Sequence, residues 1–143
     1  MLQISIVPEG YIMNINDKSL EELENDYWED SDFNSYVVQT TQNARKKPVS
    51  QLSDEEIRLL IGQKIGLKYL IPIALLLISK DPLVEVTFYK GDLLSQLLSL
   101  SYHDWEHNEE DLKYFQKIIN DNQTLIQSCD EISNDLIAKY LEG

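Results

Sequence analysis

The chain has 143 residues, of which 43% are hydrophobic, and it carries a formal net charge of −13. Its length predicts one domain over residues 1–143, and its apolar content excludes global disorder. The strong negative charge argues against a nucleic acid or an anionic membrane as a partner, and it favours a basic protein surface instead.

Turn and helix signals alternate in the N-terminal third. Apolar and polar residues alternate over residues 2–6, which predicts either a small β element or irregular structure near the N-terminus. Residues 19–22 form a capping box, Ser-Leu-Glu-Glu, that opens a short helix. A longer helix is predicted from Asn34 to about Lys46, and Pro48 prevents its continuation.

A nearly uninterrupted apolar segment occupies the middle of the chain. The capping box Ser53-Asp-Glu-Glu56 opens a helix that we expect to end or bend at Gly66. Leu67–Ser79 is apolar almost all round, which predicts a buried central helix with Pro72 in its first turn or at a kink. Its apolar run is shorter than the roughly 20 residues that a membrane span needs, so we expect no membrane insertion.

Helices also dominate the prediction for the C-terminal half. Alternating residues in 83–89 indicate a weak strand or an ordered loop, and Gly91-Asp92 opens a leucine-rich helix. Two further helices are expected, from Trp105 to about Asn120 and from about Asn122 to Leu141. The inward stripe of the last helix comprises Leu125, Cys129, Ile132, Leu136 and Tyr140. The whole pattern predicts an all-α, single-domain bundle of six or seven helices.

Acidic residues concentrate in two segments. The N-terminal acidic segment, Glu21–Asp32, has seven acids and no base, and the second acidic segment, Asp104–Asp111, has five acids. The first is the preferred interface, because Tyr27, Trp28 and Phe33 lie among its charges, as at many hot spots. Candidate contact residues are Asp26, Tyr27, Trp28, Glu29, Asp30 and Asp32 in the first segment, and Asp104, Glu106, Glu109, Glu110 and Asp111 in the second. The alternative is that the acids form a solvated face while Trp28 and Phe33 lie in the core.

Residue types that serve catalysis are few. His103 and His107 lie four apart and would share a helical face, which fits a zinc-dependent hydrolase if carboxylates supply the remaining ligands. Cys129 is the single cysteine, and its place on an apolar stripe indicates a buried side chain rather than a nucleophile. We therefore expect no catalytic residue, no metal and no cofactor. The opening MLQISIVPEG lacks the regions of a signal peptide and no internal disulfide can form, so we expect a cytoplasmic protein.

Three sequence blocks carry a family resemblance. They are KSLEELENDYW at 18–28, RKKPVSQLSDEEIRLLIGQKIGLKYLIPIAL at 45–75 and DPLVEVTFYKGDLL at 81–94, and the middle block is the most specific. In their order and spacing these blocks resemble the immunity proteins of bacterial contact-dependent growth inhibition (CDI) systems. The resemblance implies a stoichiometric inhibitor rather than an enzyme. Such an inhibitor binds the toxic C-terminal domain that a neighbouring cell delivers, and these toxins are often nucleases with basic clefts.

Two other functions remain open from the sequence. One is another acidic interaction module, such as a nucleic-acid-mimicking inhibitor, which would bind many basic proteins. The other is the metal hydrolase that uses His103 and His107, which would require a bound metal.

Overall fold

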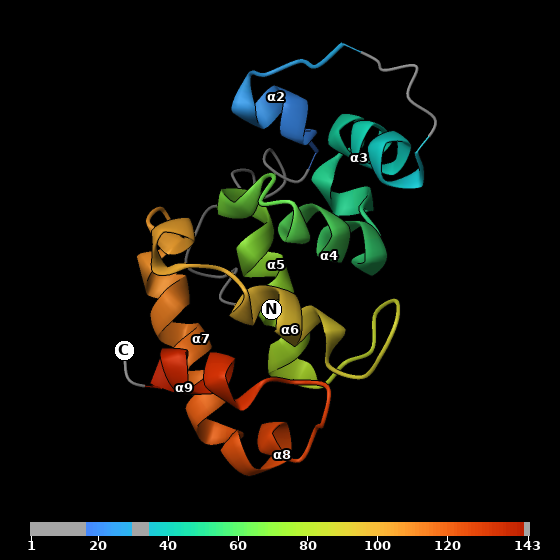
Figure 1. The fold of residues 1–143 in the computed structure, drawn as a ribbon. Coiled ribbons are helices and arrows are strands. Elements are labelled where there is room, and N and C mark those ends of the chain that lie inside the picture. Colours follow the sequence, from blue (N-terminus) through green and yellow to red (C-terminus); the bar gives the residue numbers. More distant parts are fainter. Residues whose placement is uncertain (1–16, 30–34, 142–143) are drawn as a thin grey trace. The chain divides into compact units, whose positions relative to one another are not determined.

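The computed structural model describes residues 17–29 and 35–141 (Figure 1). The protein is all-α, as predicted: these residues form α-helices joined by short 3-10 helices, turns and loops, without a β-strand. The predicted number of helices, six or seven, is too low, because the described residues alone contain eight α-helices. The chain divides into two compact units, residues 1–56 and 57–143. The predicted β element in residues 2–6 lies outside the described residues.

The first unit is built on two helices that pack against each other, α2 (Leu20–Glu24) and α3 (Tyr36–Lys46). The predicted capping box is present, because the Ser19 hydroxyl accepts from the Glu22 N–H while the Glu22 carboxylate accepts from the Ser19 N–H. A 3-10 turn, η2 (Val49–Gln51), follows the predicted stop at Pro48. The buried apolar residues of the first unit include Leu20, Ala44 and Val49.

The next helix, α4 (Asp54–Gly62), starts where the sequence predicts and ends earlier. Ser53 and Glu56 make the second capping box, with N–H to oxygen distances of 2.9 and 3.1 Å. The expected end at Gly66 is wrong. Lys64 takes the left-handed conformation (φ 61°), and its N–H bonds to the Ile61 carbonyl, which closes the helix four residues sooner. Gly66 (φ 66°) instead caps the start of the following helix.

That helix, α5 (Leu67–Lys80), is the central helix of the second unit, as predicted. It packs against α6 (Asp92–Leu98), the 3-10 helix η3 (Tyr102–Trp105) and α7 (Glu109–Asp121). Its inward row is Leu70, Ile71, Ala74, Leu75 and Ile78. Among residues 17–29 and 35–141, no helix is long and apolar enough to cross a membrane.

Pro72 lies in the interior of α5 rather than in its first turn. A proline has no N–H, so the carbonyl of Lys68, four residues earlier, has no helical donor. The side-chain Nδ2 of the buried Asn108 donates to that carbonyl oxygen at 3.1 Å. A side chain from just before α7 therefore completes the hydrogen bonding of α5.

The stretch between α5 and α6 is an ordered loop, which was one of the two predicted alternatives. Within it the structure forms only an isolated bridge, between Glu85 and Lys90, and no strand. Gly91 adopts the left-handed conformation (φ 86°) and begins α6, as its sequence predicts. The leucines of α6 are buried.

The C-terminal segments differ most from the prediction. The helix expected from Trp105 begins at Glu109, after η3. The single helix expected from Asn122 to Leu141 is two helices, α8 (Gln123–Gln127) and α9 (Asn134–Leu141). Poor helix formers in Ser-Cys-Asp-Glu-Ile-Ser-Asn weaken the intervening stretch, where turns bury Cys129 and Ile132. The predicted inward position of Leu125 is wrong, because its side chain is exposed.

An aromatic cluster joins these C-terminal elements to one another. The ring centroids of Trp105 and Phe115 are 5.0 Å apart, and those of Phe115 and Tyr140 are 5.1 Å apart. Trp105 Nε1 donates to the Tyr140 hydroxyl at 3.0 Å, and that hydroxyl donates to the Leu100 carbonyl. Burial raises the pKa of Tyr140 to about 12, so the hydroxyl keeps its proton.

Candidate functional site

Several acids of the N-terminal acidic segment (Glu21–Asp32) form hydrogen bonds or ion pairs within the first unit. Glu22 serves the capping box of α2. Glu24 Oε1 lies 3.3 Å from Arg45 Nη2, and Glu21 Oε2 lies 4.0 Å from Arg45 Nη1. Three of the acids counted in the sequence thus stabilise the fold. Asp30, Asp32 and Phe33 lie outside the described residues.

Arg45 is the basic partner that the sequence of this segment lacks. It comes from α3, and only 1% of it is exposed. Its Nη2 donates to the Asp26 carbonyl at 2.8 Å, and its Cζ lies 4.0 Å from the centre of the Trp28 ring. One guanidinium therefore binds both the backbone and the aromatic face of the segment.

Sequence reasoning missed this role of Arg45. The available signal was helical spacing, because Arg45 lies four residues after Thr41 and next to Ala44, both of which are buried. An arginine that continues a buried row needs a charged or polar partner, and an acidic segment supplies one.

The aromatic residues of this segment are at the surface. Tyr27 is 62% exposed and Trp28 is 41% exposed, so Trp28 is not a core residue, although Arg45 covers one face of it. Trp28 Nε1 donates to Asp26 Oδ2 at 3.2 Å, which fixes the indole beside a carboxylate. Asp26 and Glu29 are exposed with them. The segment can therefore present two aromatic rings and two carboxylates to a partner.

The second acidic segment (Asp104–Asp111) is divided between internal and exposed acids. Asp104 accepts from the Ser101 N–H at 2.8 Å and lies 3.1 Å from Lys64 Nζ. Burial alone would raise the pKa of Asp104, but the Ser101 N–H and the Lys64 ammonium together hold it below its ordinary value. Asp111 accepts from Asn108 Nδ2 at 2.9 Å. Exposed carboxylates remain at Glu106, Glu109 and Glu110.

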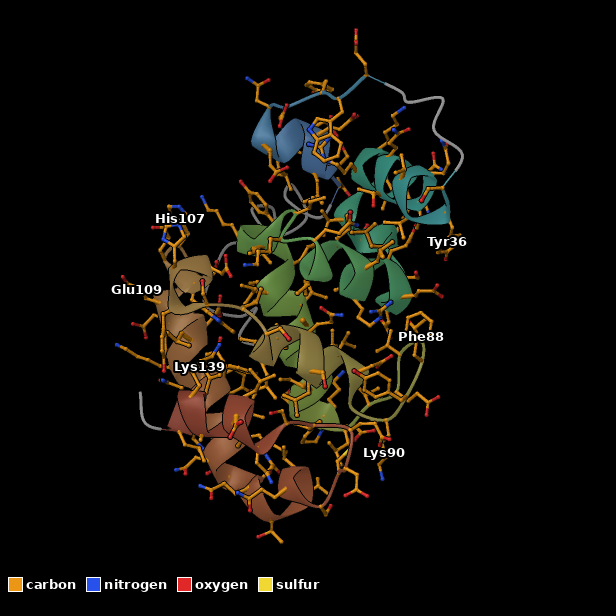
Figure 2. All side chains as sticks on the ribbon, in the orientation of Figure 1. Tyr36, Phe88, Lys90, His107, Glu109 and Lys139 are labelled. Carbon is orange, nitrogen blue, oxygen red and sulfur yellow. The ribbon has the colours of Figure 1, made fainter. Side chains whose placement is uncertain are left out.

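The two histidines do not share a helical face, because η3 ends between them. Their Nε2 atoms lie 3.6 and 3.7 Å from the same Glu106 oxygen, and both side chains are exposed (Figure 2 labels His107). In the described part of the chain, no three His, Cys, Asp or Glu side chains gather closely enough to hold a metal ion. Cys129 is buried in the turn after α8, with its Sγ 3.5 Å from the Lys90 carbonyl.

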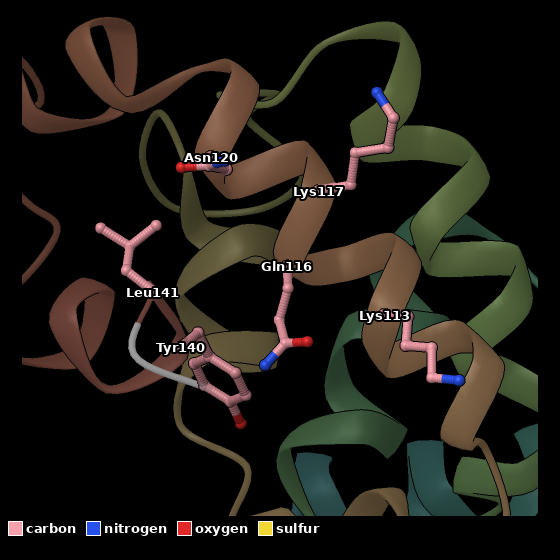
Figure 3. A pocket seen from close by; sticks show the side chains of 6 residues that line it. All are labelled: Lys113, Gln116, Lys117, Asn120, Tyr140 and Leu141. Atoms are coloured by element: carbon pink, nitrogen blue, oxygen red, sulfur yellow. The ribbon is translucent and has the colours of Figure 1, made fainter.

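A shallow pocket of about 290 Å³ lies between α7 and the end of α9 (Figure 3). Lys113 and Lys117 are its charged lining residues. Each is already paired on its own helix, Lys113 with Glu110 at 3.2 Å and Lys117 with Asp121 at 2.6 Å. Among the described residues, the pocket therefore has no convergent, unpaired charge of the kind that binds a small anion.

Comparisons with known proteins identify one family. A family model described as CDI immunity proteins matches residues 22–115, from α2 to the middle of α7. Neither the curated proteins nor the solved structures contain a match to this chain.

Proposed function

Because this chain belongs to the family of CDI immunity proteins, we propose that it binds and neutralises the toxic C-terminal domain of its cognate CDI toxin. The observation that carries the proposal is the family match over residues 22–115. The inhibitor acts stoichiometrically in the cytoplasm, where it meets toxin delivered by a neighbouring cell. It needs no cofactor and catalyses no reaction.

The charge of the chain supports a basic target, such as a nuclease with a phosphate-binding cleft. At −13, the chain attracts a positively charged domain over several ångströms before contact. Attraction of this kind speeds encounter and disfavours acidic partners. It also weakens as salt is added, which gives a direct way to measure it.

We place the electrostatic contact at the N-terminal acidic segment. Asp26 and Glu29 are exposed there beside Tyr27 and Trp28, whereas the exposed acids of the second segment are flanked by histidines and a lysine. Aromatic rings beside charges supply both contact area and steering. Asp30 and Asp32 belong to the same proposed contact by their sequence position.

The test compares two matched charge reversals. One protein carries Asp26→Lys with Glu29→Lys, and the other carries Glu109→Lys with Glu110→Lys, so both change the net charge equally. Each is mixed with the purified C-terminal domain of the cognate CDI toxin. Association rates are measured over a range of salt concentrations, and thermal unfolding verifies that each variant is folded.

We expect the reversal at Asp26 and Glu29 to slow association by about tenfold or more and to flatten its salt dependence. The reversal at Glu109 and Glu110 should have a clearly smaller effect. The opposite order would move the contact to the second acidic segment. If the wild-type protein neither binds this toxin domain nor protects cells that produce it, the proposed function is wrong.

A further inference from the structure

The loop from Glu85 to Lys90, here called the aromatic loop, is held in shape by one buried carboxylate. Only 1% of Asp92 is exposed. Its Oδ1 accepts from the Val86 N–H, and its Oδ2 accepts from the N–H groups of Thr87 and Phe88, each at 2.8 Å. Three charge-assisted hydrogen bonds thus fix three consecutive amides of the loop.

A buried arginine supports the same loop from α4. Arg58 Nε donates to the Thr87 hydroxyl at 3.0 Å, and Arg58 Cζ lies 4.8 Å from the centre of the Phe88 ring. The left-handed Gly91 closes the loop, with its N–H 3.0 Å from the Leu83 carbonyl. A side chain at position 91 would be strained by this positive φ, so the backbone conformation favours glycine there. The loop conformation is therefore determined by the second unit itself.

These contacts hold the loop in shape but do not bury Phe88, its largest apolar side chain. Phe88 is 70% exposed and projects from the loop, as Figure 2 shows. A phenylalanine has no polar group to hydrate, so its exposure forgoes the free energy that burial of the ring would supply. A partner that covers the ring would recover that free energy without having to order the loop.

We propose that the aromatic loop is a second contact surface for the toxin domain, with Phe88 inserted into an apolar pocket of that domain. This inference rests on the proposed function. A second copy of this chain is the alternative occupant, but two molecules of −13 repel each other, whereas a basic domain is attracted. The loop also lies within the matched residues 22–115.

The surroundings of Phe88 suit a partner that is apolar at the contact and basic around it. Glu85 is exposed on the loop itself. The turn that contains Cys129 touches the Lys90 carbonyl and carries the exposed acids Asp130 and Glu131. The Arg58 guanidinium beside the Phe88 ring is offset by the buried Asp92 carboxylate. The exposed carboxylates of Glu85, Asp130 and Glu131 outnumber the ammonium of Lys90, so the exposed charge near the loop is negative. An apolar centre within a charged rim is the usual arrangement of a protein interface.

The experiment measures binding of the toxin domain by Phe88→Ala. Leu125→Ala is the matched control, because it also removes an exposed apolar side chain from the second unit. Phe88→Ala should remain folded, because it removes only an exposed ring and its contact with Arg58, and it should weaken binding about 30-fold or more, the loss that defines a hot spot. The loss should appear as faster dissociation with a nearly unchanged association rate. Leu125→Ala should bind within about twofold of wild type.

The outcomes separate this inference from the function on which it rests. If wild type binds the toxin domain and Phe88→Ala binds equally well, the aromatic loop is not a contact and the proposed function stands. If wild type does not bind, both are overturned. A wild-type dimer that Phe88→Ala dissolves would assign the loop to a second copy of this chain and overturn the inference.

Discussion

The side-chain amide of Asn108 takes the place of the backbone N–H that Pro72 lacks. Asn108 Nδ2 lies 3.1 Å from the Lys68 carbonyl oxygen, the group that residue 72 would otherwise bond in α5. The same nitrogen lies 2.9 Å from Asp111 Oδ2. Both neighbours are acceptors, which fixes the orientation of the amide. The central helix and the start of α7 are linked through this one side chain.

Asn108→Ala should lower the free energy of unfolding by about 1–3 kcal/mol, because it leaves the Lys68 carbonyl without a donor. Urea denaturation followed by circular dichroism measures the change. Pro72 is exposed, so Pro72→Ala creates no cavity and restores an N–H to the helix. In the Pro72→Ala protein, Asn108→Ala should lower the free energy of unfolding by a clearly smaller amount. An identical cost in both backgrounds would mean that Asn108 does not act through this carbonyl.

Asp92 should make the stability of the second unit depend on acid. Burial alone would raise the pKa of this carboxyl, but the N–H groups of Phe88, Val86 and Thr87 together hold the pKa below its ordinary value. Because its pKa is lower in the folded state, Asp92 stabilises the fold at pH values above its ordinary pKa. That contribution is lost as pH falls through the folded-state pKa.

Asp92→Asn should therefore destabilise the protein at neutral pH and flatten the acid side of its stability profile. Urea unfolding of both proteins between about pH 3 and pH 7 gives the two profiles. Hydrogen exchange at the amides of Val86, Thr87 and Phe88 should accelerate in the variant. Parallel profiles, with a constant difference at every pH, would show that the charge of Asp92 does not hold the loop.

The two tryptophans should differ in their access to a neutral quencher. Trp105 is 1% exposed and Trp28 is 41% exposed, so acrylamide should quench mainly Trp28. Acrylamide is uncharged, and the −13 charge does not repel it. Trp28→Phe should leave an emission that resists quenching. A binding partner that covers the N-terminal acidic segment should protect Trp28 from acrylamide.

Arg45 should control how far Trp28 is shielded in the free protein. Arg45→Met removes the guanidinium from the ring face and from the Asp26 carbonyl, so quenching should increase. Arg45→Lys keeps the charge but loses the planar group, and it should not restore the shielding. If Arg45→Lys quenches like wild type, net charge rather than stacking positions the indole.

Local signals made the starts of α2 and α4 predictable, whereas the start of α7, expected at Trp105, is at Glu109. Each capping box, at Ser19 and at Ser53, is complete within four residues, so the sequence contains the whole interaction. Helix ends were less predictable. Gly66 is left-handed, as its residue type favours, but it lies at the start of α5. The left-handed residue that ends α4 is Lys64. In the sequence, helical apolar spacing continues through Cys129 and Ile132. In the structure both residues are buried in the turns between α8 and α9.

The candidate contacts were only partly visible in the sequence. Counting charges located both acidic segments, but it gave equal weight to acids that stabilise the fold and acids that face outward. Separating them required the position of Arg45, which comes from another helix. For residues 83–89 the sequence predicts a weak strand or an ordered loop. The alternation of residue types does not reveal the support from Asp92 and Arg58 that holds the aromatic loop in shape.

In the proposed contact, the residues that hold the aromatic loop in shape are different from the side chains that the loop would present to a partner. Asp92 binds main-chain N–H groups, which every residue except proline provides. Mutations at positions 86 and 88 can therefore change the side chains shown to a partner while the loop keeps its path. If the proposed contact is correct, single substitutions at positions 86 and 88 would adapt it to a changed toxin while the protein stays folded.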